Sequence, residues 1–278
     1  MNFICPEINE VKIHQNITHY LQMSSAFSSI AERDKFILNC IDHTSLEGTD
    51  NPERIQQLCR QAKDIRKQTS DQSTVASVCV YPIFAETAKQ YLTGTTIDIA
   101  CVAGAFPSGQ SPLHLRVAEA EHAVKNGATE IDMVISRGHM LAHDYEYILR
   151  EVQEFKKTIG NKHLKVILET GELQATNLIQ KAAEIAIQGG ADFIKTSTGK
   201  IKPAATLEAF YVMLDVIRTY SQKMNMKIGI KPAGGISDTE TAGQYVQVLY
   251  GHLGNEWMNK DLFRIGASRL TRKISENL

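Results

Sequence analysis

The chain has 278 residues, of which 43% are hydrophobic and 22% are charged, which is the composition of an ordinary globular protein. Its 30 basic and 31 acidic residues give a formal net charge of −1 and form no basic stripe, so the composition indicates no nucleic-acid partner. No stretch approaches about 18 consecutive apolar residues, so we expect no membrane partner either.

The cysteines and the N-terminus bear on the compartment. Five cysteines occur, an odd number, and no two have the CxxC spacing. Reduced thiols in a cytoplasmic protein explain this better than a disulfide framework. The first residues, MNFICPEINEVKIHQ, contain no basic region followed by an apolar run, so we expect no secretory signal and a cytoplasmic location.

Residues 1–34 are mixed in character and compatible with helix, and we interpret them as an N-terminal helical extension. From residue 35 onward, short apolar runs recur that are rich in Ile, Val, Phe and Cys, as is typical of buried strands. The eight predicted strands are Lys35–Asp42, Val75–Tyr81, Ile97–Ala103, Glu130–Ile135, Leu164–Glu169, Ala191–Thr196, Lys227–Lys231 and Leu262–Gly266.

Amphipathic patterns between these runs predict helices, for example over Pro112–Asn126, Asp144–Ile159, Gln174–Gln188 and Ala204–Lys223. Eight strands alternating with helices indicate βαβ units and a parallel sheet. We therefore predict an α/β fold in which residues 35–278 form a single (β/α)8 TIM barrel, the catalytic domain. An open doubly wound sheet is the alternative, although its GxGxxG motif is missing after the first predicted strand.

Polar residues occur where a barrel of this kind collects its chemistry, at the carboxyl ends of the strands. Because side chains alternate along a strand, Asp132, Lys195 and Lys231 all fall on the face opposite the Ile and Met residues beside them. We expect these three side chains to point into the barrel. Asp42 ends the first predicted strand at the same level.

Two interpretations of these lysines remain open. A structural ion pair between Asp132 and one lysine would leave the second lysine unexplained, since a buried charge without a partner is costly. Amine catalysis explains both, because burial and a neighbouring ammonium lower the pKa of a lysine, and a neutral lysine can attack a carbonyl. A carboxylate such as Asp132 could then move protons.

Glycine-rich turns follow the last two predicted strands. Pro232-Ala233-Gly234-Gly235 and Gly266-Ala267-Ser268 are such turns. Turns at these two strands of a barrel commonly hold a phosphate group through backbone N–H groups. The two turns together predict a phosphate site.

The segments FIKTSTGK, KPAGGI, LETGEL and FRIGAS together resemble the deoxyribose-phosphate aldolase family over about residues 36–270. The resemblance implies a class I aldolase without a metal or other cofactor, which reversibly cleaves 2-deoxy-D-ribose 5-phosphate to acetaldehyde and D-glyceraldehyde 3-phosphate. Its partners would then be small phosphorylated sugar and aldehyde substrates, in deoxyribonucleotide catabolism.

The resemblance also implies roles for individual residues. Lys195 matches the Schiff-base lysine, Lys231 the lysine that lowers its pKa, and Asp132 the aspartate that relays protons. The remaining matches are to substrate-binding positions, and they are Asp42, Cys79, Thr170, Gly171, Lys200, Gly234, Gly235, Gly266 and Ser268.

Three positions depart from the family pattern. Ser237 stands where many relatives have an arginine after KPAGGI, and Arg269 stands where relatives often have a small residue. Either an arginine has been relocated in this chain, or the phosphate pocket is altered. Some members also end in a tyrosine that assists proton transfer, whereas the last tyrosine here is Tyr250. Without that tyrosine, either the relay works through water and Asp132 or the proton-transfer step is slower.

Other functions remain as alternatives. A different phosphosugar lyase or a transaldolase-like enzyme would share the lysine chemistry, and a non-catalytic sugar-binding barrel would not need it. His139 and His143 have an i, i+4 spacing that can suit zinc, but the glutamate of HExxH is missing, so we predict a solvated loop pair and activity insensitive to EDTA. The outer helices would also fit a homodimer.

Overall fold

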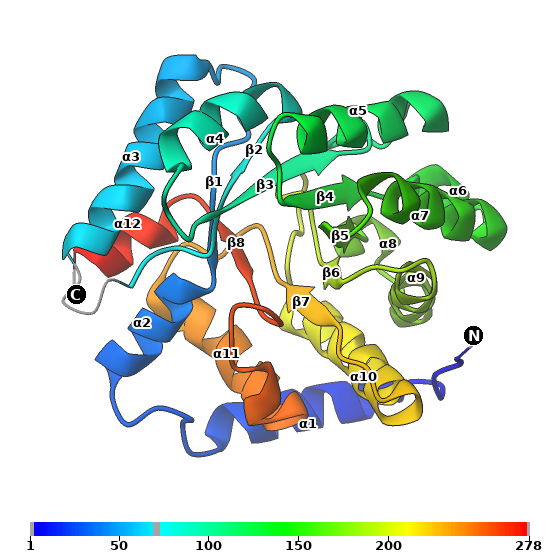
Figure 1. Cartoon of the computed structure of the whole chain (residues 1–278). Coiled ribbons are helices and arrows are strands. Elements are labelled where there is room, and N and C mark those ends of the chain that lie inside the picture. Colours follow the sequence, from blue (N-terminus) through cyan, green and yellow to red (C-terminus); the bar gives the residue numbers. More distant parts are fainter. Residues whose placement is uncertain (1–2, 69–72, 277–278) are drawn as a thin grey trace.

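The computed structural model describes residues 3–68 and 73–276, with eight parallel strands surrounded by helices (Figure 1). The predicted (β/α)8 barrel is confirmed. The strands are β1 (Ile41–Thr44), β2 (Ser77–Val80), β3 (Asp98–Ala103), β4 (Glu130–Val134), β5 (His163–Ile167), β6 (Phe193–Lys195), β7 (Gly229–Lys231) and β8 (Ile265–Ala267).

The strands follow one another in the order β7-β6-β5-β4-β3-β2-β1-β8. Isolated bridges pair Ile230 with Phe263 and Ala233 with Gly266, so the two ends of this sheet meet. The Arg264 N–H donates to the Ile230 carbonyl at 3.0 Å across the same seam. The sheet therefore forms a nearly closed barrel.

Helices cover the outside of the barrel (Figure 1). Several begin at a side-chain cap: Asp144, Thr206 and Asp238 each accept a hydrogen bond from a backbone N–H in the first turn that follows. The α-helices are α1 (Glu10–Gln22), α2 (Ile30–Asn39), α3 (Pro52–Gln68), α4 (Ala85–Leu92), α5 (Leu113–Lys125), α6 (Arg137–Leu141), α7 (Tyr145–Ile159), α8 (Thr170–Leu173), α9 (Thr176–Gln188), α10 (Leu207–Met224), α11 (Thr239–Leu253) and α12 (Leu270–Ser275). Two short 3₁₀ helices are η1 (Pro82–Phe84) and η2 (Asn255–Trp257).

The first predicted strand, Lys35–Asp42, is wrong over most of its length. Residues 35–39 belong to α2, and β1 begins only at Ile41. The helix is capped at its start, where the Ser29 hydroxyl accepts a hydrogen bond from the Glu32 N–H at 3.1 Å. A short apolar run such as 36–38 fits a helix face as well as a strand, and the cap decides between them. The helix also runs across the predicted boundary between residues 34 and 35.

Helix α1 lies across α10 and α11 (Figure 1). The Asn16 amide donates to the Tyr211 hydroxyl on α10 at 2.7 Å, and the Gln247 amide on α11 donates to the Tyr20 carbonyl at 3.0 Å. Ile13 and Ile17 are buried beneath it. The predicted N-terminal segment is thus helical and covers one side of the barrel.

Side chains alternate along the strands as expected. Ile131, Met133 and Ile194 pack between the barrel and its helices. The interior holds a small apolar cluster that includes Cys79 and Ile167. In the described part of the chain, no helix is long and apolar enough to span a membrane.

Candidate active site

Asp132 joins the two lysines that the strand pattern singled out. It lies on β4, and its Oδ2 atom accepts from the Lys195 Nζ on β6 at 2.7 Å and from the Lys231 Nζ on β7 at 2.6 Å. Paired strands align Lys195 directly beside Lys231. All three side chains are buried, as the alternation predicts.

A second layer of charge lies beside these residues. Lys165 on β5 contacts Glu130 on β4 and lies 3.5 Å from Asp132 Oδ1. Arg264 donates to Asp42 at 2.7 Å and to Glu130 at 2.9 Å. The sequence interpretation missed Lys165, Glu130 and Arg264 as site residues, although alternation along β5 places Lys165 opposite the outward Val166.

The second inward lysine has a second carboxylate partner, Asp42, which also contacts Arg264. Lys231 Nζ lies 2.5 Å from Asp42 Oδ2 as well as contacting Asp132. Ion pairing therefore accounts for both inward lysines, and not for one of them alone as the sequence suggested. What separates the two lysines is access, since Lys195 lines a pocket and Lys231 does not.

The electrostatic surroundings move the lysine pKa values in opposite directions. Burial lowers the pKa of Lys195; the Asp132 carboxylate opposes this, and the Lys231 ammonium lowers it further. Burial would also lower the pKa of Lys231, but Asp132 and Asp42 together raise it above its usual value. Burial alone would raise the pKa of Asp132, but Lys195, Lys231 and Lys165 hold it below its usual range.

Lys195 opens into a pocket of about 200 Å³ at the carboxyl ends of the strands. This pocket brings together half of the predicted site: Lys195, Lys200, Gly234, Gly235, Gly266 and Ser268. It is also lined by Ser237 and Arg269, the two residues that depart from the family pattern.

Glycines line part of this pocket, and because they have no side chains the backbone itself forms the pocket wall there. Gly234 has φ +84°, a conformation that favours glycine, and a Cβ there would lie 2.6 Å from the Ala204 Cβ. A Cβ at Gly266 would lie 3.2 Å from the Lys231 Cε. Side chains at these positions would therefore fill the pocket or displace its neighbours.

Lys200 reaches this pocket from the loop after β6. Its Nζ lies 3.1 Å from Glu47 Oε1. The loop is held by Glu169, whose carboxylate accepts from both the N–H and the hydroxyl of Thr198. Glu169 thereby positions the segment that carries Lys195 and Lys200.

The other predicted substrate-binding residues lie elsewhere. Thr170 and Gly171 line a separate pocket of about 210 Å³, where a Cβ at Gly171 would lie 1.8 Å from the Pro203 carbonyl oxygen. Asp42 and Cys79 are fully buried in the barrel interior. Burial raises the pKa of the Cys79 thiol.

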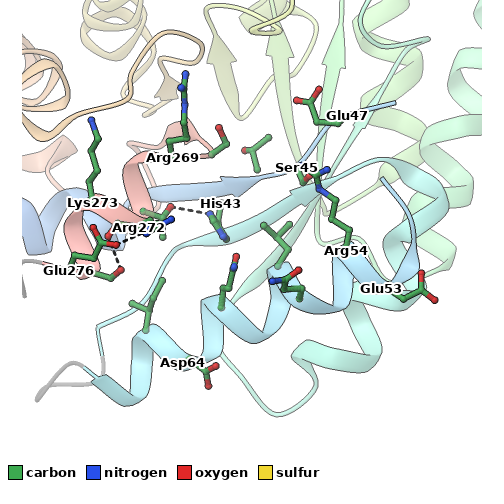
Figure 2. Close-up of a pocket in the computed structure, with 18 residues that line it drawn as sticks. His43, Ser45, Glu47, Glu53, Arg54, Asp64, Arg269, Arg272, Lys273 and Glu276 are labelled. Carbon is green, nitrogen blue, oxygen red and sulfur yellow. Dashed lines mark hydrogen bonds and ion pairs between the residues drawn. The ribbon is translucent and has the colours of Figure 1, made fainter. Parts of the chain in front are cut away.

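A larger groove of about 1310 Å³ lies between α3 and α12 (Figure 2). It meets the lysine pocket at four residues that line both, Thr44, Glu47, Ser268 and Arg269. Figure 2 shows His43 at its floor, bonded to the Thr271 hydroxyl at 3.0 Å. None of the predicted catalytic residues lines this groove.

The histidine pair is divided between different partners. His139 Nδ1 lies 2.9 Å from Asp144, and His143 Nδ1 lies 2.6 Å from the Tyr145 hydroxyl. Within residues 3–68 and 73–276, no group of three or more His, Cys, Asp or Glu side chains is arranged to hold a metal ion.

The sequence of this barrel matches a known family over residues 36–248, described as DeoC/LacD family aldolase. The chain belongs to the DeoC/LacD aldolase family. It is therefore a lyase, and the resemblance noted from the motifs is confirmed.

Named relatives agree with this assignment. The chain is 42% identical to a human deoxyribose-phosphate aldolase over 248 residues, which cover 86% of this chain and 78% of the human one. It is 41% identical to the Bos taurus deoxyribose-phosphate aldolase, covering 87% and 79%. The solved deoxyribose phosphate aldolase from Aeropyrum pernix, described as a tetramer, has the same fold: TM-score 0.71, 22% identity, covering 97% of this chain and 98% of that one.

Proposed function

We propose that this DeoC/LacD family member is a class I aldolase that reversibly cleaves 2-deoxy-D-ribose 5-phosphate to acetaldehyde and D-glyceraldehyde 3-phosphate. The names of its relatives support the substrate. The observation that carries the proposal is that Lys195 is buried in a charged network yet lines the pocket. A lysine in that position can be neutral and still reach a substrate.

In the first step the Nζ of neutral Lys195 attacks the C1 carbonyl carbon of the open-chain sugar. The carbinolamine takes up a proton and loses water, which leaves an iminium between Nζ and C1. Asp132 lies 2.7 Å from this nitrogen and is suited to relay those protons. Lys231 keeps its own proton and favours the neutral form of Lys195 by like-charge repulsion.

In the second step the C2–C3 bond breaks, and its electron pair moves toward the iminium nitrogen. The C3 hydroxyl loses its proton and becomes the carbonyl of D-glyceraldehyde 3-phosphate. The enamine that remains takes up a proton at C2, and water then hydrolyses the new iminium to release acetaldehyde and free Lys195. The reaction balances without a metal or redox partner.

The phosphate group is assigned to the glycine-lined end of the pocket. Gly234, Gly235, Gly266 and Ser268 offer close backbone approach there, and Lys200 supplies a positive charge. Thr170 and Gly171 lie behind the Lys200 loop, where the Thr170 N–H donates to the Thr196 carbonyl at 2.9 Å. In this proposal they support the loop.

Borohydride trapping tests the proposal. Incubation with acetaldehyde and borohydride should attach an ethyl group irreversibly to Lys195, found by mass spectrometry of the peptides, and Lys195→Ala should abolish the adduct. Lys202→Ala, in the neighbouring loop, is the matched control and should keep it. An unmodified protein, or an adduct that survives Lys195→Ala, would contradict the mechanism.

A donor panel tests the substrate. Cleavage of deoxyribose 5-phosphate should exceed that of unphosphorylated deoxyribose, and longer ketose donors should not be cleaved. Turnover of a ketose donor instead would point to the transaldolase-like alternative. A cytoplasmic, catabolic role belongs to the same proposal.

A further inference from the structure

The barrel centre holds more positive than negative groups. Seven ionisable side chains form one buried cluster, and each is at most 3% exposed. Its cations are Lys165, Lys195, Lys231 and Arg264, and its carboxylates are Asp42, Glu130 and Asp132. With every group in its ordinary charge state, the cluster carries one positive charge without a counter-charge.

The carboxylates are shared unevenly among the cations. Lys165 lies within 4 Å of all three. Lys231 contacts Asp42 and Asp132, and Arg264 contacts Asp42 and Glu130. Among the carboxylates of the described residues, Lys195 contacts Asp132 alone, and it shares that oxygen atom with Lys231. Lys195 is therefore the least compensated cation.

Other ionisable groups facing the cluster do not remove this excess. The Cys79 thiol, on β2, is neutral because burial raises its pKa. At the opposite end of the barrel, His163 lies 3.3 Å from Glu130 and Asp98 lies 3.9 Å from Arg264. Both side chains are partly exposed, so water screens their interactions with the buried cluster.

A buried charge without a partner is costly, and an ionisable group in that position gives up its charge. Arg264 cannot do so, because a guanidinium keeps its proton in proteins. A neutral Lys165 would weaken ion pairs with three carboxylates, and a neutral Lys231 would weaken ion pairs with two. A neutral Lys195 would weaken an ion pair with one carboxylate, which still contacts Lys231.

We propose that Lys165, Glu130 and Arg264 are positioning residues. They set the net charge of the buried cluster so that Lys195 is the lysine without a proton. None of the three lines the pocket. This proposal rests on the proposed function of Lys195 as the nucleophile. The three residues act through Asp42 and Asp132, without touching the substrate.

Variants that change or keep the net charge of the cluster test this proposal. Lys165→Met removes the excess charge, so Lys195 should keep its proton and the pH midpoint of iminium trapping should rise by about one unit, which is about tenfold less trapping below the midpoint. Glu130→Gln increases the excess, so the midpoint should fall. Lys165→Arg keeps the charge and should keep the midpoint. The double variant Lys165→Met/Glu130→Gln restores the count and should return the midpoint toward that of the unmodified protein.

The readout is the rate of trapping with acetaldehyde and cyanoborohydride, which survives in water across this range, between pH 5 and pH 10 (about 0.5-unit steps, to resolve a one-unit shift). Opposite shifts for the two single variants support the proposal. Shifts in the same direction, or none, overturn it, because loss of packing alone would not move the midpoint with the sign of the charge.

A second measurement uses the unmodified protein and does not depend on how the variants fold. Carbon-13 NMR of lysine-labelled protein at pH 7 should show one neutral buried lysine, missing in Lys195→Ala. If all buried lysines are ammonium groups, the inference fails even where trapping succeeds. If one lysine is neutral but no adduct forms in the unmodified protein, the proposed function fails. The inference that the net charge of the cluster leaves Lys195 neutral is then still supported.

Discussion

Lys195 and Lys231 contact the same carboxylate oxygen, Asp132 Oδ2, at 2.7 and 2.6 Å. Two ammonium groups roughly 5 Å apart repel each other by about 3 kcal/mol at an effective dielectric constant of about 20. Asp132 offsets this repulsion for one of them. Because Asp42 also contacts Lys231, that lysine is favoured to keep its proton, and Lys195 is favoured to lose it.

Replacing Lys231 should move the activity to higher pH. The Lys231 ammonium lowers the pKa of Lys195, so Lys231→Met should raise that pKa and leave less neutral amine at pH 7. We expect kcat/KM at pH 7 to fall at least about tenfold and the acid limb of its pH profile to shift upward. Lys231→Arg keeps the charge and should keep the limb. An unchanged limb in Lys231→Met would count against the tuning role.

Because Lys200 pairs with Glu47, replacing one or the other should have opposite effects on phosphate binding. Lys200→Ala should raise the KM for deoxyribose 5-phosphate about tenfold, which corresponds to about 1.4 kcal/mol, and leave the KM for deoxyribose unaffected. Glu47→Gln removes the competing carboxylate and should lower the KM for the phosphorylated substrate. If Lys200→Ala weakened both substrates equally, Lys200 would not be a phosphate ligand.

The contact between α1 and α11 should matter for stability. A Cβ at Gly251 would lie 2.5 Å from the Tyr20 ring, so Gly251→Ala should lower the free energy of unfolding by about 1–3 kcal/mol despite the helix preference of alanine. Urea unfolding measures this. Gly48→Ala is the control, since a Cβ there would meet nothing within 4 Å. Tyr20→Ala in the Gly251→Ala background should add less than it does alone; full additivity would contradict the clash.

His43 should make the fold less stable in acid. Burial lowers its pKa from 6.5 to about 4, so the unfolded chain takes up a proton near pH 6.5 and the folded chain does so only near pH 4. Neutral His43 contributes about 3 kcal/mol to the free energy of unfolding above pH 6.5, and this contribution is lost as the pH falls toward 4.

His43→Asn should therefore flatten the dependence of unfolding free energy on pH between 6.5 and 4, as measured by urea unfolding at several pH values. His114→Asn, at an exposed position, is the control. Equal slopes in the unmodified protein and in His43→Asn would show that His43 is not the group responsible.

Strand periodicity was sufficient to predict that Asp132, Lys195 and Lys231 share the barrel interior. Alternation also turns Lys165 inward, but its role, like that of Arg264, depends on carboxylate partners that other strands supply. Lys165 meets Asp42 from a position 123 residues away along the chain, and nothing local encodes that approach. The prediction of the first strand was wrong for a different reason. A three-residue apolar run fits the period of a helix as well as that of a strand, and the Ser29 cap favours the helix.

By itself, the sequence determined the barrel, its eight-fold alternation and the residues that face inward, because these follow from a period of two between glycine- and proline-bounded turns. Only the tertiary structure decided which charges meet. Closure of the barrel brings seven ionisable side chains from β1, β4, β5, β6, β7 and the approach to β8 into one water-poor space, where distances between strands set every interaction. Lys195, the proposed nucleophile, is distinguished from the neighbouring cations by those distances and by its access to the pocket, and neither is a property of the residue alone.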